Sequence, residues 1–316
     1  MCARNNPGRM HIKTVPSSPI RHRIFQFVPA RLIIMSIFTD GVVGLFYNYV
    51  RLGSSLKNPG SVLHCKLGDS PGEGTGRFGT VGRVDEMALV TDNDNSIRIC
   101  TMSDTHDRHY LITELPICDI LVHTGDIFMT GRLISDSLAV NKLKKFNDWL
   151  GTLPATHKIV IGGNHDKIFE QLGAEAVQSF LTNAHYLCNS SVQLYGLTFW
   201  GTPLSHGRSG NAAFQHPSFE ETALDVLKDR MTNSQEEVDV LITHGPCSHI
   251  GELVQPRLMH MSGHVHRDHG IRVTRRKDHD DGSARRQWYR VSAPIMDHRY
   301  HPTQLPIVVD IARPNK

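Results

Sequence analysis

The chain lacks paired cysteines. Its six cysteines are scattered over 316 residues, and no two of them form a C-x-x-C pair. Cys100 and Cys118 stand in apolar, strand-like runs, so we expect buried free thiols of a reducing compartment rather than a disulfide framework. A cytoplasmic location is the corresponding expectation.

An excess of charge of one sign is also absent. Lys and Arg number 34 against 31 Asp and Glu, which leaves a net charge of +3. This balance gives no general reason to expect a nucleic acid or an anionic membrane surface as a partner. With 39% hydrophobic residues, the chain can bury a packed core in one large domain or two smaller ones.

The first 39 residues contain six Lys or Arg and no acidic side chain, and no small-residue cleavage site follows them. Such a segment resembles an organelle transit peptide, which would direct the protein to mitochondria. The stretch Leu32–Val50 is apolar and near the length of a membrane-spanning helix, although Asp40 and Asn48 interrupt it. A helix packed on the domain is the third interpretation. Residues 1–52 are therefore an N-terminal extension that serves as an anchor, through residues 32–50, or as a packed helix.

Residues 53–95 show little apolar periodicity and contain eight glycines between Gly53 and Gly82, which predicts a linker. Within it, Gly74–Val81 fits the G-x-G-x-x-G-x-V loop that covers ATP phosphates in protein kinases. A kinase needs a lysine on the next strand, where Met87–Val90 offers valine, and no H-R-D or D-F-G segment follows. The kinase interpretation is rejected.

From residue 96 onward, short β-rich runs alternate with helical ones, which indicates an α/β layered domain over residues 96–312. Strands are predicted at Ile97–Met102, Ile120–His123, Lys158–Ile161 and Val238–Ile242. Helices are predicted at Leu133–Leu150, where Leu138, Leu143, Phe146 and Leu150 have helical spacing, and at Pro217–Met231.

Five short segments rich in metal ligands are spread over this region. They are Ser103-Asp104-Thr105-His106, Gly125-Asp126, Gly163-Asn164-His165-Asp166, Thr243-His244-Gly245 and Gly263-His264-Val265-His266. Taken singly, most of them are explained as well by a polar turn, whereas Gly163-Asn164-His165-Asp166, which directly follows an apolar run, is more specific. Together they predict a metal site, because loops at the carboxyl ends of strands converge on one crevice. Carboxylate, amide and imidazole ligands suit two divalent ions about 3.5–4 Å apart in a phosphoester-cleaving centre.

The five segments, read as D-x-H, G-D, G-N-H-(D/E), H and G-H-x-H, resemble the pattern of the calcineurin-like metallophosphoesterase superfamily. Further segments resemble its class III phosphodiesterase-like branch, which includes the metallophosphoesterase-domain-containing proteins: Leu121–Asp126, Trp149–Pro154, His157–Ile161, Thr243–Pro246 and Pro306–Asp310. The resemblance covers residues 96–312. It implies a four-layer αββα sandwich with a dinuclear metal site at the C-terminal loops of the strands.

The resemblance also implies roles for individual residues. One metal would be held by Asp104, His106, Asp126 and His266, and the second by Asp126, Asn164, His244 and His264. The ions would be Mn, Fe or Zn, and a hydroxide bridging them would be the nucleophile. His165 would protonate the leaving oxygen as a catalytic residue, and Asn164 and His165 would contact substrate.

The implied activity is that of a phosphodiesterase or phosphomonoesterase for a small-molecule phosphoester such as a cyclic nucleotide. A non-catalytic scaffold of the same fold, a nuclease and a protein phosphatase are the alternatives. Three positions depart from the expected pattern. Met129 replaces an acidic residue that would orient His165, Gly201–His206 lacks tryptophan, and Cys247-Ser248-His249 is short. The basic stretch Arg272–Arg290 is interpreted as a solvated hairpin rather than a nucleic-acid patch. The sequence does not indicate the oligomeric state.

Overall fold

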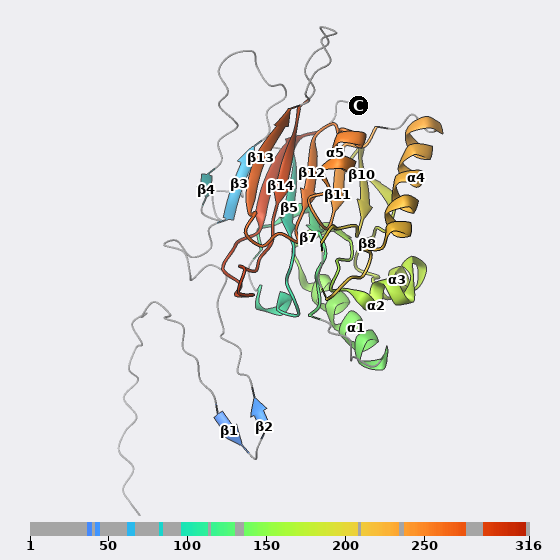
Figure 1. The fold of residues 1–316 in the computed structure, drawn as a ribbon. Coiled ribbons are helices and arrows are strands. Elements are labelled where there is room, and N and C mark those ends of the chain that lie inside the picture. Colours follow the sequence, from blue (N-terminus) through green and yellow to red (C-terminus); the bar gives the residue numbers. More distant parts are fainter. Residues whose placement is uncertain are drawn as a thin grey trace, which may run out of the picture.

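Two β-sheets lie face to face with helices on their outer sides (Figure 1). The computed structural model describes residues 37–39, 42–44, 62–66, 82–84, 96–112, 115–129, 136–207, 210–233, 237–275 and 287–313. The predicted metal-ligand segments all fall within these ranges.

The first sheet has seven strands in the order β4-β3-β15-β5-β6-β7-β8. Its strands are β3 (Val62–Lys66), β4 (Gly82–Val84), β5 (Ser96–Met102), β6 (Cys118–His123), β7 (Ala155–Val160), β8 (His185–Tyr186) and β15 (Ile307–Ala312). From β5 to β8 the neighbouring strands are parallel, whereas β15 runs antiparallel to β5. Three of the predicted strands therefore end at the same edge of this sheet.

The second sheet has six strands in the order β13-β14-β12-β11-β10-β9. Its strands are β9 (Ser190–Leu194), β10 (Leu197–Thr202), β11 (Val240–Thr243), β12 (Met259–Ser262), β13 (Gly270–Arg275) and β14 (Gln287–Ser292). The pairs β10–β11, β11–β12 and β12–β14 are parallel, and β9 and β13 are antiparallel edges. Strands β13 and β14 form the hairpin predicted for Arg272–Arg290, whose tip lies outside the described residues.

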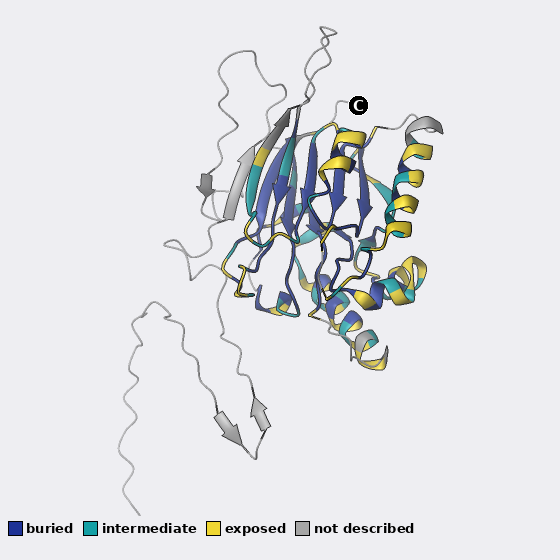
Figure 2. Ribbon diagram, viewed as in Figure 1, coloured by how far each residue is buried: buried dark blue, intermediate teal, exposed yellow. Residues whose placement is uncertain are grey.

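An apolar core lies between the two sheets, where most of the central strands are dark blue in Figure 2. Ile99, Ile120 and Val122 of the first sheet belong to one buried cluster with Val240 and Ile242 of the second. These strands are apolar along nearly their whole length because helices cover the opposite faces as well.

Helices α1 (Asp136–Thr152), α2 (Lys167–Leu172) and α3 (Ala174–Phe180) cover the seven-stranded sheet, and α4 (Pro217–Asn233) and α5 (Ser248–Val254) cover the six-stranded one. Leu143, Phe146 and Leu150 of α1 pack on Leu121 of β6 in one cluster. A short 3-10 turn, η2 (His109–Leu111), follows β5. The predicted four-layer αββα arrangement is confirmed.

Two details of the helical and cysteine predictions can be compared with the structure. Leu138 is exposed, so the apolar stripe of α1 begins later than its sequence spacing indicates. Cys100 and Cys118 are buried free thiols, as predicted.

The described parts of the N-terminal region are strands. Ile37–Thr39 (β1) and Val42–Gly44 (β2) pair antiparallel, so these residues of Leu32–Val50 do not form the helix that both the anchor and the packed-helix interpretations require. Within the predicted linker, β3 pairs in parallel with β15, and β4 pairs with β3, so these two segments belong to the sheet. The remainder of residues 1–95, including Gly74–Val81, lies outside the described residues, and the domain boundaries stay a prediction. Among the described helices, none has the length and apolar character needed to cross a membrane.

Candidate metal centre

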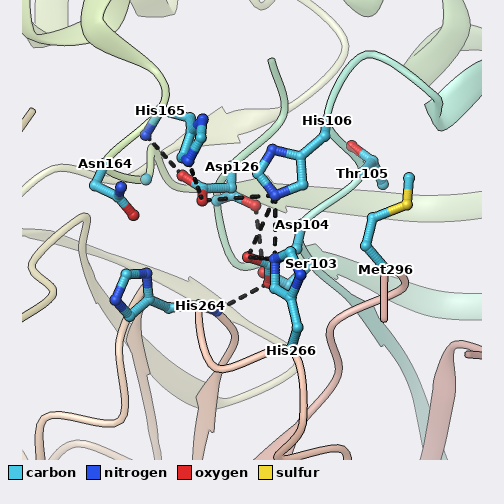
Figure 3. A network of polar contacts seen from close by, with 12 residues as sticks. Ser103, Asp104, Thr105, His106, Asp126, Asn164, His165, His264, His266 and Met296 are labelled. Atoms are coloured by element: carbon cyan, nitrogen blue, oxygen red, sulfur yellow. Dashed lines mark hydrogen bonds and ion pairs between the residues drawn. The ribbon is translucent and has the colours of Figure 1, made fainter. Parts of the chain in front are cut away.

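All five predicted ligand segments begin where a strand ends. Those carrying Asp104, Asp126 and Asn164 follow β5, β6 and β7 of the seven-stranded sheet, and those carrying His244 and His264 follow β11 and β12 of the other sheet. The carboxyl ends of both sheets meet at one place, so the side chains converge as predicted (Figure 3). The local reason is that each buried strand stops at a polar turn.

The first group of candidate metal ligands consists of Asp104, His106 and His266, whose potential ligand atoms all lie within 4.8 Å of one another. Nε2 of His266 is 3.3 Å from Oδ1 of Asp104, and Nε2 of His106 is 3.9 Å from the same oxygen. The two imidazole nitrogens are 3.2 Å apart. One carboxylate oxygen and two ring nitrogens therefore face a common point.

The second group consists of Asp126, His244 and His264, with ligand atoms again within 4.8 Å. Nε2 of His244 lies 3.2 Å from Oδ1 of Asp126 and 3.1 Å from Oδ1 of Asn164. The Asn164 amide nitrogen donates to the Asn211 carbonyl, so its oxygen is the atom that faces His244. This places an amide oxygen beside the candidate ligands of the second group.

Asp126 lies between the two groups. Its Oδ1 faces His244, whereas its Oδ2 is 3.8 Å from Nε2 of His106 in the first group. A carboxylate that presents one oxygen to each group has the arrangement of a bridging ligand.

Three of the histidines are held in one orientation by backbone carbonyl groups. Nδ1 of His244 is 2.8 Å from the Thr124 oxygen, Nδ1 of His266 is 2.8 Å from the Asp297 oxygen, and Nε2 of His264 is 3.2 Å from the His206 oxygen. A carbonyl only accepts, so these nitrogens carry the proton and leave a lone pair on the other ring nitrogen of the neutral form. Metal-ligating histidines are oriented in this way.

The donor set fits divalent cations. Oδ2 of Asp104 accepts the backbone N–H of His264 at 2.9 Å, but its Oδ1 is buried without a hydrogen bond. A buried acceptor without a donor is costly, and a cation beside it removes this cost. Carboxylate, imidazole and amide ligands suit Mn²⁺, Fe or Zn²⁺.

The charges of the site favour a cation as well. Burial lowers the pKa of His106 to about 4, so its ring is neutral at pH 7. Burial alone would raise the pKa of Asp126, but the charge and hydrogen bond of His244 outweigh it and the net shift is downward. Burial opposes protonation of His244, yet the Asp126 carboxylate raises its pKa to about 9. The ionised carboxylates therefore attract positive charge to this position.

The backbone of the site is strained. Asp104, His106, Asp126 and His264 have positive φ angles of 54°, 43°, 53° and 66°, a region that non-glycine residues rarely adopt. Backbone hydrogen bonds from Asp104 to Gly125 and from His106 to Asp126 hold two of these turns in place. Such conformations persist where the surrounding structure imposes them, which is common at functional sites.

Two glycines of the ligand segments leave room for the carboxylates. A Cβ at Gly163 would collide with Oδ1 of Asp126, and one at Gly263 would collide with Oδ2 of Asp104. These glycines are thus required by close packing against ligand side chains.

His165 lies beside the same carboxylate. Its backbone N–H donates to Oδ1 of Asp126 at 2.8 Å, and its Nε2 is 4.0 Å from Oδ2. The Asn211 amide nitrogen is 3.4 Å from this Nε2 and is a polar neighbour of the ring. Met129 has no group that could orient the ring, and it is 43% exposed. Asn211 carries no sequence signal that would have identified it.

Two other residues of the site were missed by sequence reasoning. Asp166 accepts backbone N–H bonds from Ile127, Phe128 and Gly163, and so ties the Asn164 loop to the Asp126 loop. Asp166 stands in the Gly-Asn-His-Asp segment, and this position in the sequence could have identified it as part of the site. The Tyr300 ring meets those of His106 and His266 at centroid distances of 4.9 and 5.0 Å, and nothing in the sequence around it indicated this.

Comparison with known proteins agrees with this geometry. A family model described as calcineurin-like phosphoesterase matches residues 97–272. Metallophosphoesterase domain-containing protein 1 of Homo sapiens is 30% identical over 259 residues, which is 69% of this chain and 72% of that protein. The protein of that name from Mus musculus gives the same values. A UPF0046 protein of Caenorhabditis elegans is 27% identical over 258 residues, covering 70% of this chain and 83% of the relative.

The chain belongs to the calcineurin-like phosphoesterase family, a family of metal-dependent phosphoester hydrolases that includes some non-catalytic members. Within it, the chain lies in the branch of the metallophosphoesterase-domain-containing proteins. The clusters of His and Asp described above fit the metal centre that is typical of the family.

Proposed function

We propose that the protein is a phosphodiesterase for small substrates such as cyclic nucleotides, and that it depends on two divalent metal ions. The observation that supports this most directly is the position of Asp126, with one oxygen toward His244 and the other toward His106. A single carboxylate placed in this way joins two ligand groups into one dinuclear centre.

The ligand assignment follows from the two groups. Asp104, His106, Asp126 and His266 would hold one ion, and Asp126, Asn164, His244 and His264 would hold the other. When bound, the ions would lower the pKa of a coordinated water, which would supply the nucleophile near neutral pH, and would neutralise charge on the phosphoryl oxygens.

The protein residues set the charge of the site. Asp104 and Asp126 contribute two negative charges. Asn164 is uncharged, and each neutral histidine, with one N–H and one lone pair on its ring, adds no charge. Against the four positive charges of two divalent ions, the occupied site stays positive and attracts an anionic phosphoester.

His165 completes the site as the catalytic acid. Its ring lies edge-on to His106, with the centroids 4.7 Å apart, and next to Oδ2 of Asp126. From this position it donates a proton to the leaving oxygen or a hydrogen bond to a phosphoryl oxygen. Asn164 and His165 are the substrate contacts of this proposal.

A non-catalytic scaffold is the second candidate, since the family contains such members. The complete set of ligands favours the enzyme, because a scaffold has no need for a strained, fully assembled centre. The two are distinguished by turnover: a scaffold binds metal and hydrolyses no phosphoester.

The test is a panel of phosphoesters with Mn²⁺-loaded protein, including 2′,3′- and 3′,5′-cyclic nucleotides and a chromogenic diester and monoester. Asp126→Asn keeps the shape of the side chain and removes its charge, and we expect it to abolish turnover. Asp148→Asn, at an exposed position of α1, is the matched control and should retain it. Wild-type turnover in the Asp126 variant would refute the proposal.

A further inference from the structure

A separate cluster of metal-ligand side chains lies where the β10–α4 connection, α4 and α5 meet. It consists of His206, in the loop after β10, Glu220, in the first turn of α4, and His249, near the start of α5. None of the three belongs to the ligand groups of the main centre. Both histidines stand in the segments Gly201–His206 and Cys247-Ser248-His249, where the sequence departs from its branch.

The distances in this cluster match a small coordination sphere. Nε2 of His249 is 2.8 Å from Oε1 of Glu220, and Nε2 of His206 is 3.7 Å from the same oxygen. All three ligand atoms lie within 4.8 Å of one another, and the two imidazole rings have centroids 4.9 Å apart. Tetrahedral Zn²⁺ with bonds of about 2.0–2.1 Å places its ligand atoms about 3.3–3.4 Å apart. The observed separations lie on both sides of this value.

The cluster is open to solvent. The side chains of His206, Glu220 and His249 are 50%, 31% and 45% exposed. An ion entering here keeps water on its free positions, so the cost of desolvation is small. With one carboxylate and two imidazoles, the set has the two-histidine, one-carboxylate composition of zinc sites that leave a position open.

We propose that His206, Glu220 and His249 form a third divalent-metal site, which binds Zn²⁺. The ion joins the β10–α4 loop and α4, which are neighbours in the sequence, to α5, which follows β11. The site also adjoins the main centre, because the backbone oxygen of His206 accepts the Nε2–H of His264. One residue thus contributes its side chain to the third site and its main chain to the orientation of a ligand of the main centre.

The experiment measures zinc bound by the full chain after removal of metal with EDTA and dialysis against Zn²⁺. Elemental analysis gives the number of equivalents for the wild type, His249→Asn, Glu220→Gln and His216→Asn. His216 is the matched control, since it is also 50% exposed and its Nε2 lies 3.4 Å from a single carboxylate, that of Glu170. We expect His249→Asn and Glu220→Gln to bind one equivalent less than the wild type and His216→Asn.

Failure of this proposal can be separated from failure of the proposed function. Asp126→Asn should weaken the main centre and keep the one equivalent that His249→Asn removes. Equal zinc content in His249→Asn, Glu220→Gln and His216→Asn would overturn the third site whatever the main centre does. A second measurement uses the wild type alone, so it does not depend on whether a variant folds. It is diffraction from zinc-soaked crystals, recorded at the zinc absorption edge. An anomalous peak between the three side chains supports the site, and its absence overturns it.

Discussion

The backbone N–H of His264 donates a hydrogen bond to Oδ2 of Asp104 at 2.9 Å. Asp104 follows β5 of the seven-stranded sheet and His264 follows β12 of the six-stranded one, so this bond joins the two sheets at the metal centre. It also fixes which oxygen of Asp104 remains for a cation, because Oδ1 is left toward His106 and His266.

Asp104→Asn tests whether one oxygen of Asp104 accepts the His264 N–H while the other binds a cation. Asparagine can still accept the His264 N–H, but it presents a neutral group to the first metal. We expect metal content to fall by about one equivalent and turnover to fall at least ~100-fold, since changes even outside the ligands cost 10–100-fold. Elemental analysis and kcat measurement check this, and thermal melting of the metal-free protein should change little. Full metal content with normal turnover would contradict the assignment.

Asn211→Ala tests the position of His165. Loss of the Asn211 amide removes the group 3.4 Å from Nε2 of His165, so the ring is less well oriented. We expect kcat to fall roughly 10-fold with metal content unchanged, whereas His165→Asn should lower kcat by about 10²–10⁴-fold, the usual contribution of a general acid. The pH profile of kcat should shift in Asn211→Ala only if His165 is the acid. Loss of metal in either variant would indicate a structural role instead.

Gly163→Ala tests the close packing around Asp126. A methyl group there meets Oδ1 of Asp126 and the adjoining backbone, so the ligand loop must move. We expect a loss of about 1–3 kcal/mol in the free energy of unfolding, which is typical of overpacking, together with weaker metal binding. Gly210→Ala is the control, because no atom lies within 4 Å of the position its Cβ would take. Similar melting temperatures for the two variants would argue against the packing explanation.

His260 predicts a pH effect on stability that is separate from the metal ligands. Burial, followed by the charge of Arg290, lowers the pKa of this histidine to about 3 in the folded chain, against about 6.5 when unfolded. Stability from the neutral ring is therefore present above pH 6.5 and is lost as the pH falls toward 3. At pH 5 the loss amounts to roughly 2 kcal/mol relative to a pH well above 6.5.

The comparison uses His260→Gln, whose side chain does not titrate in this range and can donate to the Thr243 hydroxyl in place of Nε2. Urea unfolding of both proteins at several pH values, with EDTA present throughout, isolates the contribution of this residue. We expect the wild type to lose stability relative to the variant on acidification. A difference that stays constant with pH would show that His260 does not titrate between the two states.

The sequence alone determined the ligand segments and the layered fold, because both depend on short-range patterns. Buried strands leave apolar runs such as Ile97–Met102, and the turns after them must carry the ligands that the chemistry needs. The helix predicted over Pro217–Met231 was also confirmed, and it ends two residues later, at Asn233.

Only the tertiary structure decided which residues surround these ligands. Asn211 beside His165, Tyr300 beside His106, and the meeting of His206 with Glu220 and His249 depend on how distant loops pack, which local periodicity does not encode. The strands β3 and β4 were missed for the same reason, since β3 pairs with β15, and β4 with β3, through backbone groups that every residue carries.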